Sequence, residues 1–176
     1  MTRPTDSQPV ISLVEVSAEG RLSWPSGSVP CALGRAGVRR DKREGDGATP
    51  IGVFPLRDLW YRPDRVPRPR TLLECHEIEP GWGWCDDPDD ERYNRAVRLP
   101  YPARHERLWR DDGLYDLIVP LGYNDAPAVP GLGSAIFLHV AAPEYAPTEG
   151  CVAIARDALL ELLARCGPKT KLKVSA

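Results

Sequence analysis

Short apolar runs, each ended by glycine, proline or polar residues, recur along this 176-residue chain and predict short β-strands. Residues 10–16 are apolar and largely β-branched, Glu19-Gly20 indicates a turn, and residues 21–24 complete a hairpin. Further strand-like runs lie at 28–33, 51–56, 114–119 and 135–141. The last of these is almost continuously apolar, as expected of a strand that is buried on both faces.

A helical pattern appears only near the C-terminus, at residues 156–166. Leucines 159, 162 and 163 fall on one face together with Cys166, and Gly167-Pro168 ends the helix. The alternating residues 171–174 then predict a closing strand at the edge of a sheet. We therefore expect a mainly β fold with one or two helices, organised as a single domain over residues 1–176.

The segment 62–105 is the least regular part of the chain. Prolines crowd residues 62–70, and each proline removes an amide and restricts the residue before it. We expect an irregular insertion or lid that packs on the body of the domain. Its aromatic residues, such as Trp82, Trp84 and Tyr93, either line a groove for sugar or peptide or hold the loop in place.

Charge and hydropathy exclude some classes of function. The chain has 23 basic and 25 acidic residues, interspersed, for a net charge of −2, which argues against nucleic-acid binding. No apolar run approaches the ~20 residues of a membrane span. Residues 1–9 lack the apolar core of a signal peptide, so both a cytoplasmic location and export by another route stay open. The oligomeric state is not indicated.

The five cysteines give no metal signature. Cys75, His76 and Cys85 fit no standard zinc spacing and lack an evident fourth ligand, although Cys75 and Cys85 can pair in an oxidising compartment. The turn at residues 45–50 lacks the lysine and the spacing of a phosphate-binding loop. We therefore expect no metal and no cofactor.

The candidate chemistry lies in residues 135–154. His139 ends an apolar run, and Cys151 stands between a glycine and another apolar run. A free thiol has a pKa of about 8.5 and needs a base to become a nucleophile, and the eleven loop-like residues between the two allow His139 to supply it. Gly150 permits a tight turn that directs the amides of Gly150 and Cys151 at an oxyanion. A buried thiol and an unrelated imidazole are the alternative.

Two blocks of sequence resemble the YkuD-type L,D-transpeptidases. In that family a strand-borne histidine is followed by a loop and a Ser/Thr-x-Gly-Cys block, which here reads Thr148-Glu149-Gly150-Cys151. Residues 43–54 resemble the family's Thr-Pro-x-Gly-x-Phe segment after a glycine-rich turn. The resemblance extends over about residues 31–174. It implies a β-sandwich or barrel-like catalytic domain and a periplasmic, cell-envelope location.

The resemblance also implies a reaction. Cys151 attacks the carbonyl of an L-residue in a peptidoglycan stem peptide, and His139 acts as general base and acid. The acyl group then passes to an acceptor amine, giving a cross-link, or to water. A backbone carbonyl commonly orients the histidine in the family, but Asp125, Glu144 and Glu149 are near enough in sequence to do so instead.

The chain departs from the family pattern around the nucleophile. Glu149 replaces the usual second histidine, Ala153 replaces an arginine, and the gap between histidine and cysteine is shortened. Another cation must then meet a substrate carboxylate, and Arg43 and Arg156 are the candidates. A remodelled pocket could also shift the donor bond to the one that follows L-Ala.

Three further residues are candidates for substrate binding. The Thr148 hydroxyl either fixes the loop before Cys151 or contacts the substrate, and Tyr123, with Asn124 beside it, follows a predicted strand. Tyr123 is a candidate extra oxyanion donor.

Three competing functions stay open. One is an L,D-carboxypeptidase or amidase that uses the same cysteine and histidine to hydrolyse stem peptides. The others are a non-catalytic wall-binding domain and a cytoplasmic cysteine hydrolase of recycled wall peptides.

Overall fold

The computed structural model describes residues 9–176, so the expectation for the segment 1–9 lies almost wholly outside the described residues. The elements follow in chain order: β1 (Leu13–Ser17), β2 (Arg21–Trp24), β3 (Gly27–Pro30), β4 (Val38–Arg39), β5 (Thr49–Pro50), β6 (Gly52–Pro55), β7 (Leu59–Tyr61), β8 (Cys75–Glu77), β9 (Trp82–Cys85), β10 (Arg95–Arg98), β11 (His105–Arg107), β12 (Leu117–Pro120), β13 (Phe137–Val140), the 3-10 turn Pro143–Tyr145, β14 (Val152–Ile154), α1 (Arg156–Leu163) and β15 (Lys171–Val174). The prediction of a mainly β fold with one or two helices is confirmed.

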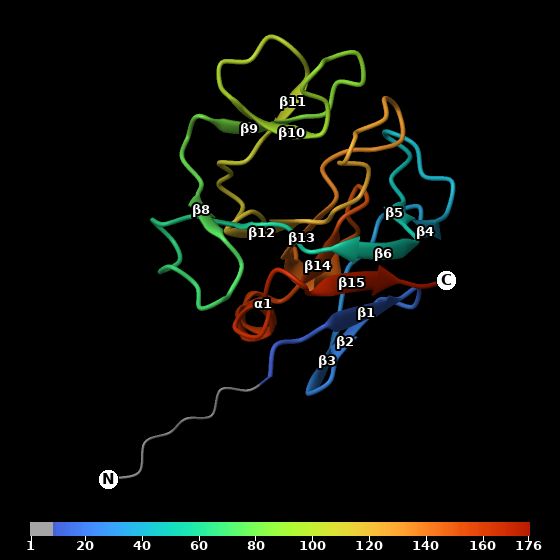
Figure 1. Cartoon of the computed structure of the whole chain (residues 1–176), viewed down its shortest axis with the longest axis vertical. Coiled ribbons are helices and arrows are strands. Elements are labelled where there is room, and N and C mark those ends of the chain that lie inside the picture. Colours follow the sequence, from blue (N-terminus) through green and yellow to red (C-terminus); the bar gives the residue numbers. More distant parts are fainter. Residues whose placement is uncertain (1–8) are drawn as a thin grey trace.

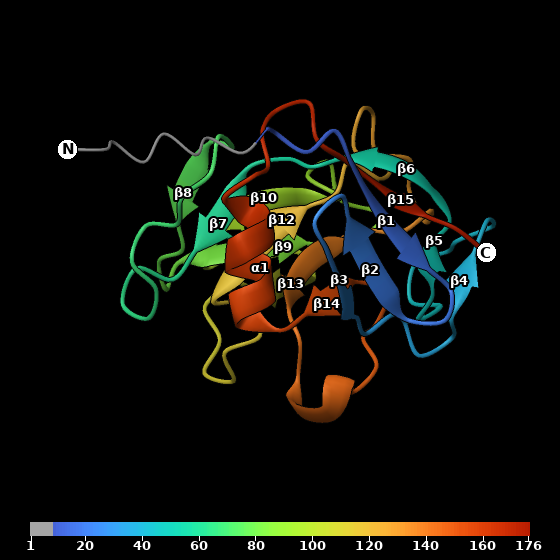
Figure 2. The same ribbon diagram turned by 90° about the horizontal axis from the view of Figure 1, so that it is seen from below.

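Two five-stranded sheets form the body of the molecule (Figure 1). Their strand orders are β3-β2-β1-β15-β6 and β14-β13-β12-β7-β8. One buried apolar cluster draws side chains from both sheets and from α1, including Val14, Leu138 and Leu162. The core therefore lies between the sheets, with α1 packed beside them, as the view from below shows (Figure 2).

The predicted helix and hairpin are present with small changes at their ends. The strands β1 and β2 pair antiparallel, with Val16 opposite Leu22. Helix α1 buries Leu159, Leu162 and Leu163, as its period predicts, and ends three residues before Cys166. No helix in the described residues is long and apolar enough to cross a membrane.

The prediction that residues 171–174 form an edge strand is wrong. β15 lies inside its sheet, parallel to β1 on one side and antiparallel to β6 on the other. Its alternation of Lys171 and Lys173 with Leu172 and Val174 reflects the two faces of the sheet, because the leucine and valine are buried in the core and Lys171 is exposed. Alternation marks a half-buried strand and does not mark an edge.

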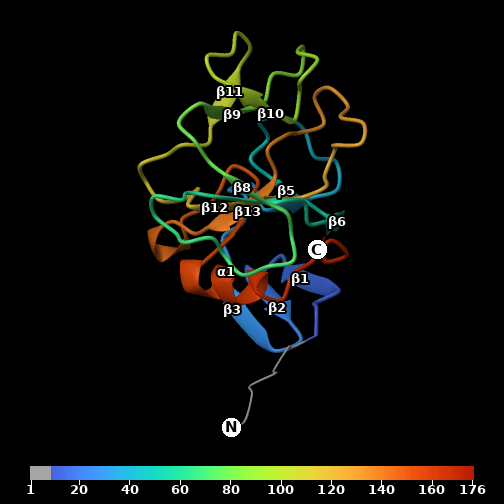
Figure 3. The same ribbon diagram turned by 60° about the vertical axis from the view of Figure 1, so that its left-hand side comes forward.

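The segment 62–105 is more regular than the sequence predicts. It contains β8, β9 and β10, and β9 pairs with both β10 and β11 in a separate three-stranded sheet. Figure 3 shows this sheet at one end of the molecule, with the β1–β3 hairpins at the other. The strands of this segment are short, and each of its prolines lies outside them. The prolines therefore indicate the loops between the strands and do not exclude strands from the segment.

Candidate active site

His139 lies on β13, a central strand that pairs with β12 on one side and β14 on the other. It is 5% exposed, and its Nδ1 lies 2.8 Å from the backbone oxygen of Val140. Because a carbonyl oxygen only accepts hydrogen bonds, Nδ1 carries the proton in neutral His139 and the lone pair lies on Nε2. A backbone carbonyl therefore orients the imidazole, and no carboxylate is needed for this task.

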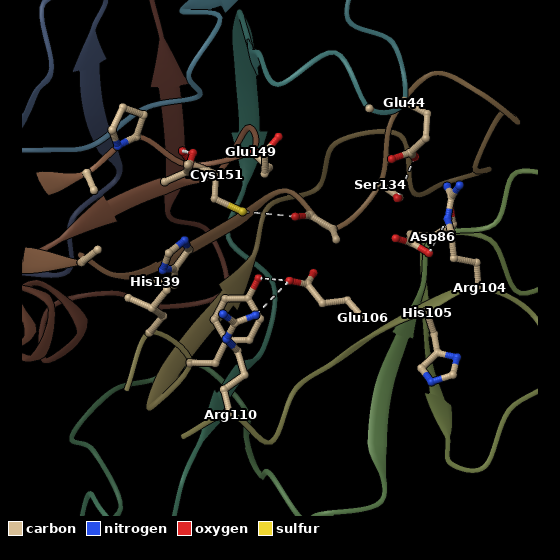
Figure 4. A pocket seen from close by; sticks show the side chains of 18 of the residues that line it. Glu44, Asp86, Arg104, His105, Glu106, Arg110, Ser134, His139, Glu149 and Cys151 are labelled. Atoms are coloured by element: carbon tan, nitrogen blue, oxygen red, sulfur yellow. Dashed lines mark hydrogen bonds and ion pairs between the residues drawn. The ribbon is translucent and has the colours of Figure 1, made fainter. Parts of the chain in front are cut away.

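Cys151 lies directly before β14, and β14 pairs with β13, the strand of His139. Its side chain is buried among the second apolar cluster of the molecule, and its sulfur is held by the backbone. The thiol donates to the Ala135 oxygen at 3.2 Å and accepts from the Phe137 N–H at 3.3 Å. Figure 4 shows the imidazole of His139 and the sulfur of Cys151 on the same side of the cavity.

Thr148 and Gly150 fix the loop that leads to the nucleophile. The Thr148 hydroxyl donates to the Cys151 carbonyl at 2.7 Å and accepts from the Gly150 N–H at 3.1 Å. Gly150 has a φ of +137°, and a Cβ there would lie 2.8 Å from the Ala48 oxygen. Only glycine meets both conditions without strain. The hydroxyl of Thr148 therefore holds the loop, which was one of its two predicted roles.

The amide of Gly150, one of the two predicted oxyanion donors, has a partner in this structure. Its N–H is already bonded to the Thr148 hydroxyl, so it cannot donate to a substrate oxygen without breaking that bond. The amide of Cys151 is the second predicted oxyanion donor, and it remains a candidate for that role.

A cavity of about 620 Å³ opens beside the cysteine and the histidine. Four of the predicted residues line it, namely His139, Thr148, Glu149 and Cys151. The remaining lining residues are Lys42, Glu44, Gly45, Asp86, Arg104, His105, Glu106, Arg110, Leu114, Tyr115, Ser134, Ala135, Ala142, Ala146 and Pro147.

Tyr123 and Asn124 do not line this cavity. The Tyr123 hydroxyl donates to the Leu132 oxygen at 2.6 Å, and its ring packs edge-on against Phe54. The Asn124 amide holds the following turn through Val129, with which it exchanges two hydrogen bonds. Both residues shape the loop after β12, because their polar atoms already have backbone partners.

The predicted cations, Arg43 and Arg156, also lie outside the cavity lining. Arg43 contributes its backbone to the glycine-rich turn, and its N–H donates to Asp46. Arg156 begins α1 and donates to the backbone oxygen of Arg65. The cavity instead receives three other cations, namely Lys42, Arg104 and Arg110.

Lys42 and Glu44 anchor the glycine-rich turn inside the cavity. Lys42 is 4% exposed, and its Nζ lies 2.6 Å from Asp46. Glu44 accepts hydrogen bonds from Ser134 at 2.8 Å and from Tyr93 of the insertion. These interactions connect the turn to the strand region before His139.

The wall opposite the nucleophile was missed by sequence reasoning. The Tyr115 ring lies edge-on to the imidazole of His139, 5.3 Å between centroids, and its hydroxyl donates to Glu106 at 2.5 Å. Arg110 lies 3.8 Å from the same carboxylate, and Arg104 pairs with Asp86 at 3.1 Å. No motif in the sequence links these residues to His139. Glu106 comes from β11 of the separate sheet, and Tyr115 lies two residues before β12, which pairs with β13.

Burial sets the protonation of the reacting pair. It lowers the pKa of His139 to about 4, even though the Val140 carbonyl opposes the shift. Burial also raises the pKa of Cys151 to about 12, and the negative charge of Glu106 adds to that effect. Thiol and imidazole are therefore both neutral at physiological pH, and they do not form a resting ion pair.

Glu149 stands at the rim of the cavity. Both of its carboxylate oxygens accept from Arg35 Nε, at 3.1 and 3.0 Å, and its side chain is 78% exposed. The residue that replaces the family's second histidine is thus paired with a cation that the sequence did not indicate.

Cys75 and Cys85 are free thiols, so the suggested pairing between them is not present. In the described residues, a possible set of metal ligands occurs at Asp58, Glu74 and His76, outside the cavity. His76 Nε2 lies 2.9 Å from Asp58, at hydrogen-bonding distance, and the carboxylates are largely solvated. This arrangement is accounted for by an ordinary surface hydrogen bond.

The comparisons with known proteins agree with this fold. Residues 12–174 match the family model of the YkuD L,D-transpeptidase catalytic domain. The chain therefore belongs to the YkuD L,D-transpeptidase catalytic domain family, which confirms the resemblance of the two sequence blocks. No curated protein sequence matches the chain.

Three solved structures are similar to this chain at low sequence identity. Bd1075 of Bdellovibrio bacteriovorus is 15% identical, with a TM-score of 0.51 over 98% of this chain and 50% of that one. An L,D-transpeptidase from Mycobacterium smegmatis is 13% identical, with a TM-score of 0.43 over 94% and 59% of the two chains. L,D-transpeptidase 1 of Mycobacterium tuberculosis is 12% identical, with 0.42 over 95% and 62%. This chain thus covers 50 to 62% of the length of those proteins.

Proposed function

We propose that this protein is a peptidoglycan L,D-transpeptidase that transfers an acyl group through a thioester on Cys151. The observation that carries the proposal is the shared cavity of Cys151 and His139, in which the Val140 contact places the proton of neutral His139 on Nδ1 and its lone pair on Nε2. Family membership supplies the class of reaction, and the size of the cavity suits a peptide of a few residues.

In the first half-reaction, the Cys151 sulfur attacks the carbonyl carbon of an L-residue in the donor stem peptide. Because thiol and imidazole are both neutral at rest, the thiol proton passes to Nε2 of His139 as the C–S bond forms. The tetrahedral oxyanion needs a donor, for which the Cys151 amide is the candidate. His139 then gives its proton to the departing amine, and the C–N bond breaks.

In the second half-reaction, an acceptor amine attacks the thioester carbonyl and a new C–N bond replaces the C–S bond. Attack by water instead would give hydrolysis, as in a carboxypeptidase. The competition between them depends on how the cavity admits each nucleophile.

The positions of the cations support a shifted donor bond. Ala153 is fully buried in β14, so no arginine can reach the cavity from that position. The solvent-accessible cations Arg104 and Arg110 come from the opposite wall. A donor carboxylate would bind there, and we propose that this geometry favours the bond after L-Ala over the bond after the third residue.

Mass spectrometry of defined muropeptides tests this function. Tetrapeptide stems are incubated with the protein and with a Cys151→Ala variant, and intact protein mass reports the thioester. We expect dimers that depend on Cys151, with fragmentation locating the donor residue at L-Ala. Donors only at position three would overturn the shifted bond, and trimmed monomers alone would identify a hydrolase. Binding without any turnover would identify a wall-binding domain.

The proposed substrate places the protein in the cell envelope. A reporter that is active only after export, fused to the native protein, tests this location, and a cytoplasmic signal would favour an enzyme acting on recycled wall peptides.

A further inference from the structure

We propose that Glu106 is a second catalytic residue, whose carboxylate binds the acceptor as an ammonium ion and removes one proton from it. This inference rests on the proposed transpeptidation and assigns a residue to its second half-reaction.

The chemistry of the acceptor creates the need for such a group. A primary amine has a pKa near the 10.4 of lysine, so at neutral pH it arrives as an ammonium ion without a lone pair. One proton must leave before the amine attacks, and a second leaves from the tetrahedral intermediate. If His139 accepted the first proton, it would be unable to accept the second until it had released the first.

Glu106 is placed to accept that first proton. It projects from β11 into the cavity, on the wall facing Cys151 and His139 (Figure 4). Its contacts with Tyr115 and Arg110 both involve Oε1. Within residues 9–176, Oε2 has no hydrogen-bond partner, and the side chain is 29% exposed, so this oxygen is available to a ligand.

Three other carboxylates line the cavity, and each has partners of its own. Glu44 accepts from two hydroxyls, Asp86 pairs with Arg104, and Glu149 pairs with Arg35. Glu106 differs from these three in its proximity to the nucleophile, because it is the cavity carboxylate whose negative charge acts on the Cys151 thiol.

The charge of Glu106 opposes the first half-reaction, in which the acyl-enzyme forms, and favours the second, in which the acceptor ammonium binds. Its negative charge raises the pKa of the Cys151 thiol, which opposes formation of the acyl-enzyme. Burial raises the pKa of Glu106 itself, against the opposing effects of Tyr115 and Arg110. That shift brings the carboxyl closer in basicity to an amine, because desolvation favours the neutral acid and neutral amine over the ion pair.

The protons balance over the step. The acceptor ammonium gives one proton to Glu106 Oε2, and the neutral amine forms a C–N bond to the thioester carbon. The intermediate gives a second proton to His139, the C–S bond breaks, and His139 returns that proton to the Cys151 sulfur. Glu106 releases its proton to solvent when the product leaves.

The test uses two acceptors of different charge with the Glu106→Gln variant. D-alanine is an ammonium at pH 7, whereas hydroxylamine is uncharged. We expect aminolysis of the acyl-enzyme by D-alanine to fall about a hundredfold, and that by hydroxylamine to change less than about threefold. The variant's rate with D-alanine should also rise about tenfold per pH unit between pH 7 and 9, as the free amine becomes more abundant.

Two controls separate catalysis from structure. Glu161→Gln removes a carboxylate from the exposed face of α1 and should change neither acceptor's rate. Alkylation of Cys151 in Glu106→Gln should be faster than in the unmodified protein, since the opposing charge is gone, while alkylation of the buried Cys166 stays unchanged.

Three results would overturn the assignment. Equal losses with both acceptors would make Glu106 a support for Tyr115, and no loss with D-alanine would leave it without a role in proton transfer. If the unmodified protein forms no thioester at all, the proposed function fails first, and the inference fails with it.

Discussion

The two walls of the cavity are held in place by different forces. His139 stands on β13 and Cys151 directly precedes the neighbouring strand β14. Backbone groups of Val140, Ala135 and Phe137 fix their polar atoms. The opposite wall comes from residues 104–115, whose side chains hold one another through ion pairs and hydroxyls. The first wall is dry, because His139 and Cys151 are buried, and that burial sets the protonation of the reacting groups. The second is wetter and charged, which suits recognition.

The most severe test of this contrast is His139→Gln. Glutamine keeps a polar side chain but cannot accept the thiol proton, so we expect acyl-enzyme formation to slow by about a thousandfold. Intact-mass kinetics with a tetrapeptide stem measure this rate, with Cys151→Ala as the variant that forms no adduct. Acylation of the variant at the rate of the unmodified protein would show that His139 does not accept the thiol proton.

The same residue should make stability depend on pH. The pKa of His139 is about 4 in the folded chain and 6.5 when exposed, so between these values the unfolded chain binds the proton better. Stability should therefore be lost as pH falls from 6.5 to 4, by about 3 kcal/mol from this group. Urea unfolding at pH 7 and pH 4 measures the loss.

The His139→Gln variant supplies the comparison for that experiment. It lacks the titrating imidazole, so its stability should fall by about 3 kcal/mol less over the same range. Equal losses in the two proteins would mean that His139 keeps an ordinary pKa and is not desolvated.

A smaller effect is expected at Thr148, which supports the dry wall. Thr148→Val removes the bonds to Gly150 and Cys151, each worth about 1 kcal/mol, so unfolding should become easier by about 2 kcal/mol. Thr148→Ser retains the hydroxyl and should recover most of this loss. If valine is tolerated as well as serine, the hydroxyl does not hold the loop.

The smallest change in stability is expected on the charged wall. Arg104 is 59% exposed and pairs with Asp86, so Arg104→Gln should alter unfolding by less than about 1 kcal/mol. Its effect should appear in KM, which we expect to rise about tenfold while kcat stays near its original value. A fall in kcat with an unchanged KM would place Arg104 in the chemical step.

The sequence predicts the dry wall far better than the charged one. His139 and Cys151 belong to short local patterns, an apolar strand run and a glycine before a cysteine, and the core requires both. Local hydropathy likewise predicts the hairpin and α1. It fails at β15, because alternation reports which face is buried and carries no information about neighbours.

The charged wall depends on contacts between distant segments. Tyr115 meets His139 because β12, which begins two residues later, pairs with β13, whereas Glu106 reaches the same cavity from β11 of the separate sheet. Nothing in the spacing of Tyr115 and Glu106 requires this combination. The prediction that Arg43 and Arg156 bind a substrate carboxylate depends on their proximity in sequence to the two blocks that resemble the family. The structure places them elsewhere, since the cavity is built from residues that come together in space.

Because β13 and β14 pair in parallel, the position of the Cys151 sulfur is set by the sheet, whereas part of the cavity lining is set by the connecting loop. His139 faces Ala153 across the ladder, so the register of the strands places the sulfur, whatever path the chain takes between them. The connecting residues 141–147, three of which line the cavity, are therefore exchangeable in length and composition. Replacing this segment offers a route to new acceptor preferences in which the reactive centre is inherited intact.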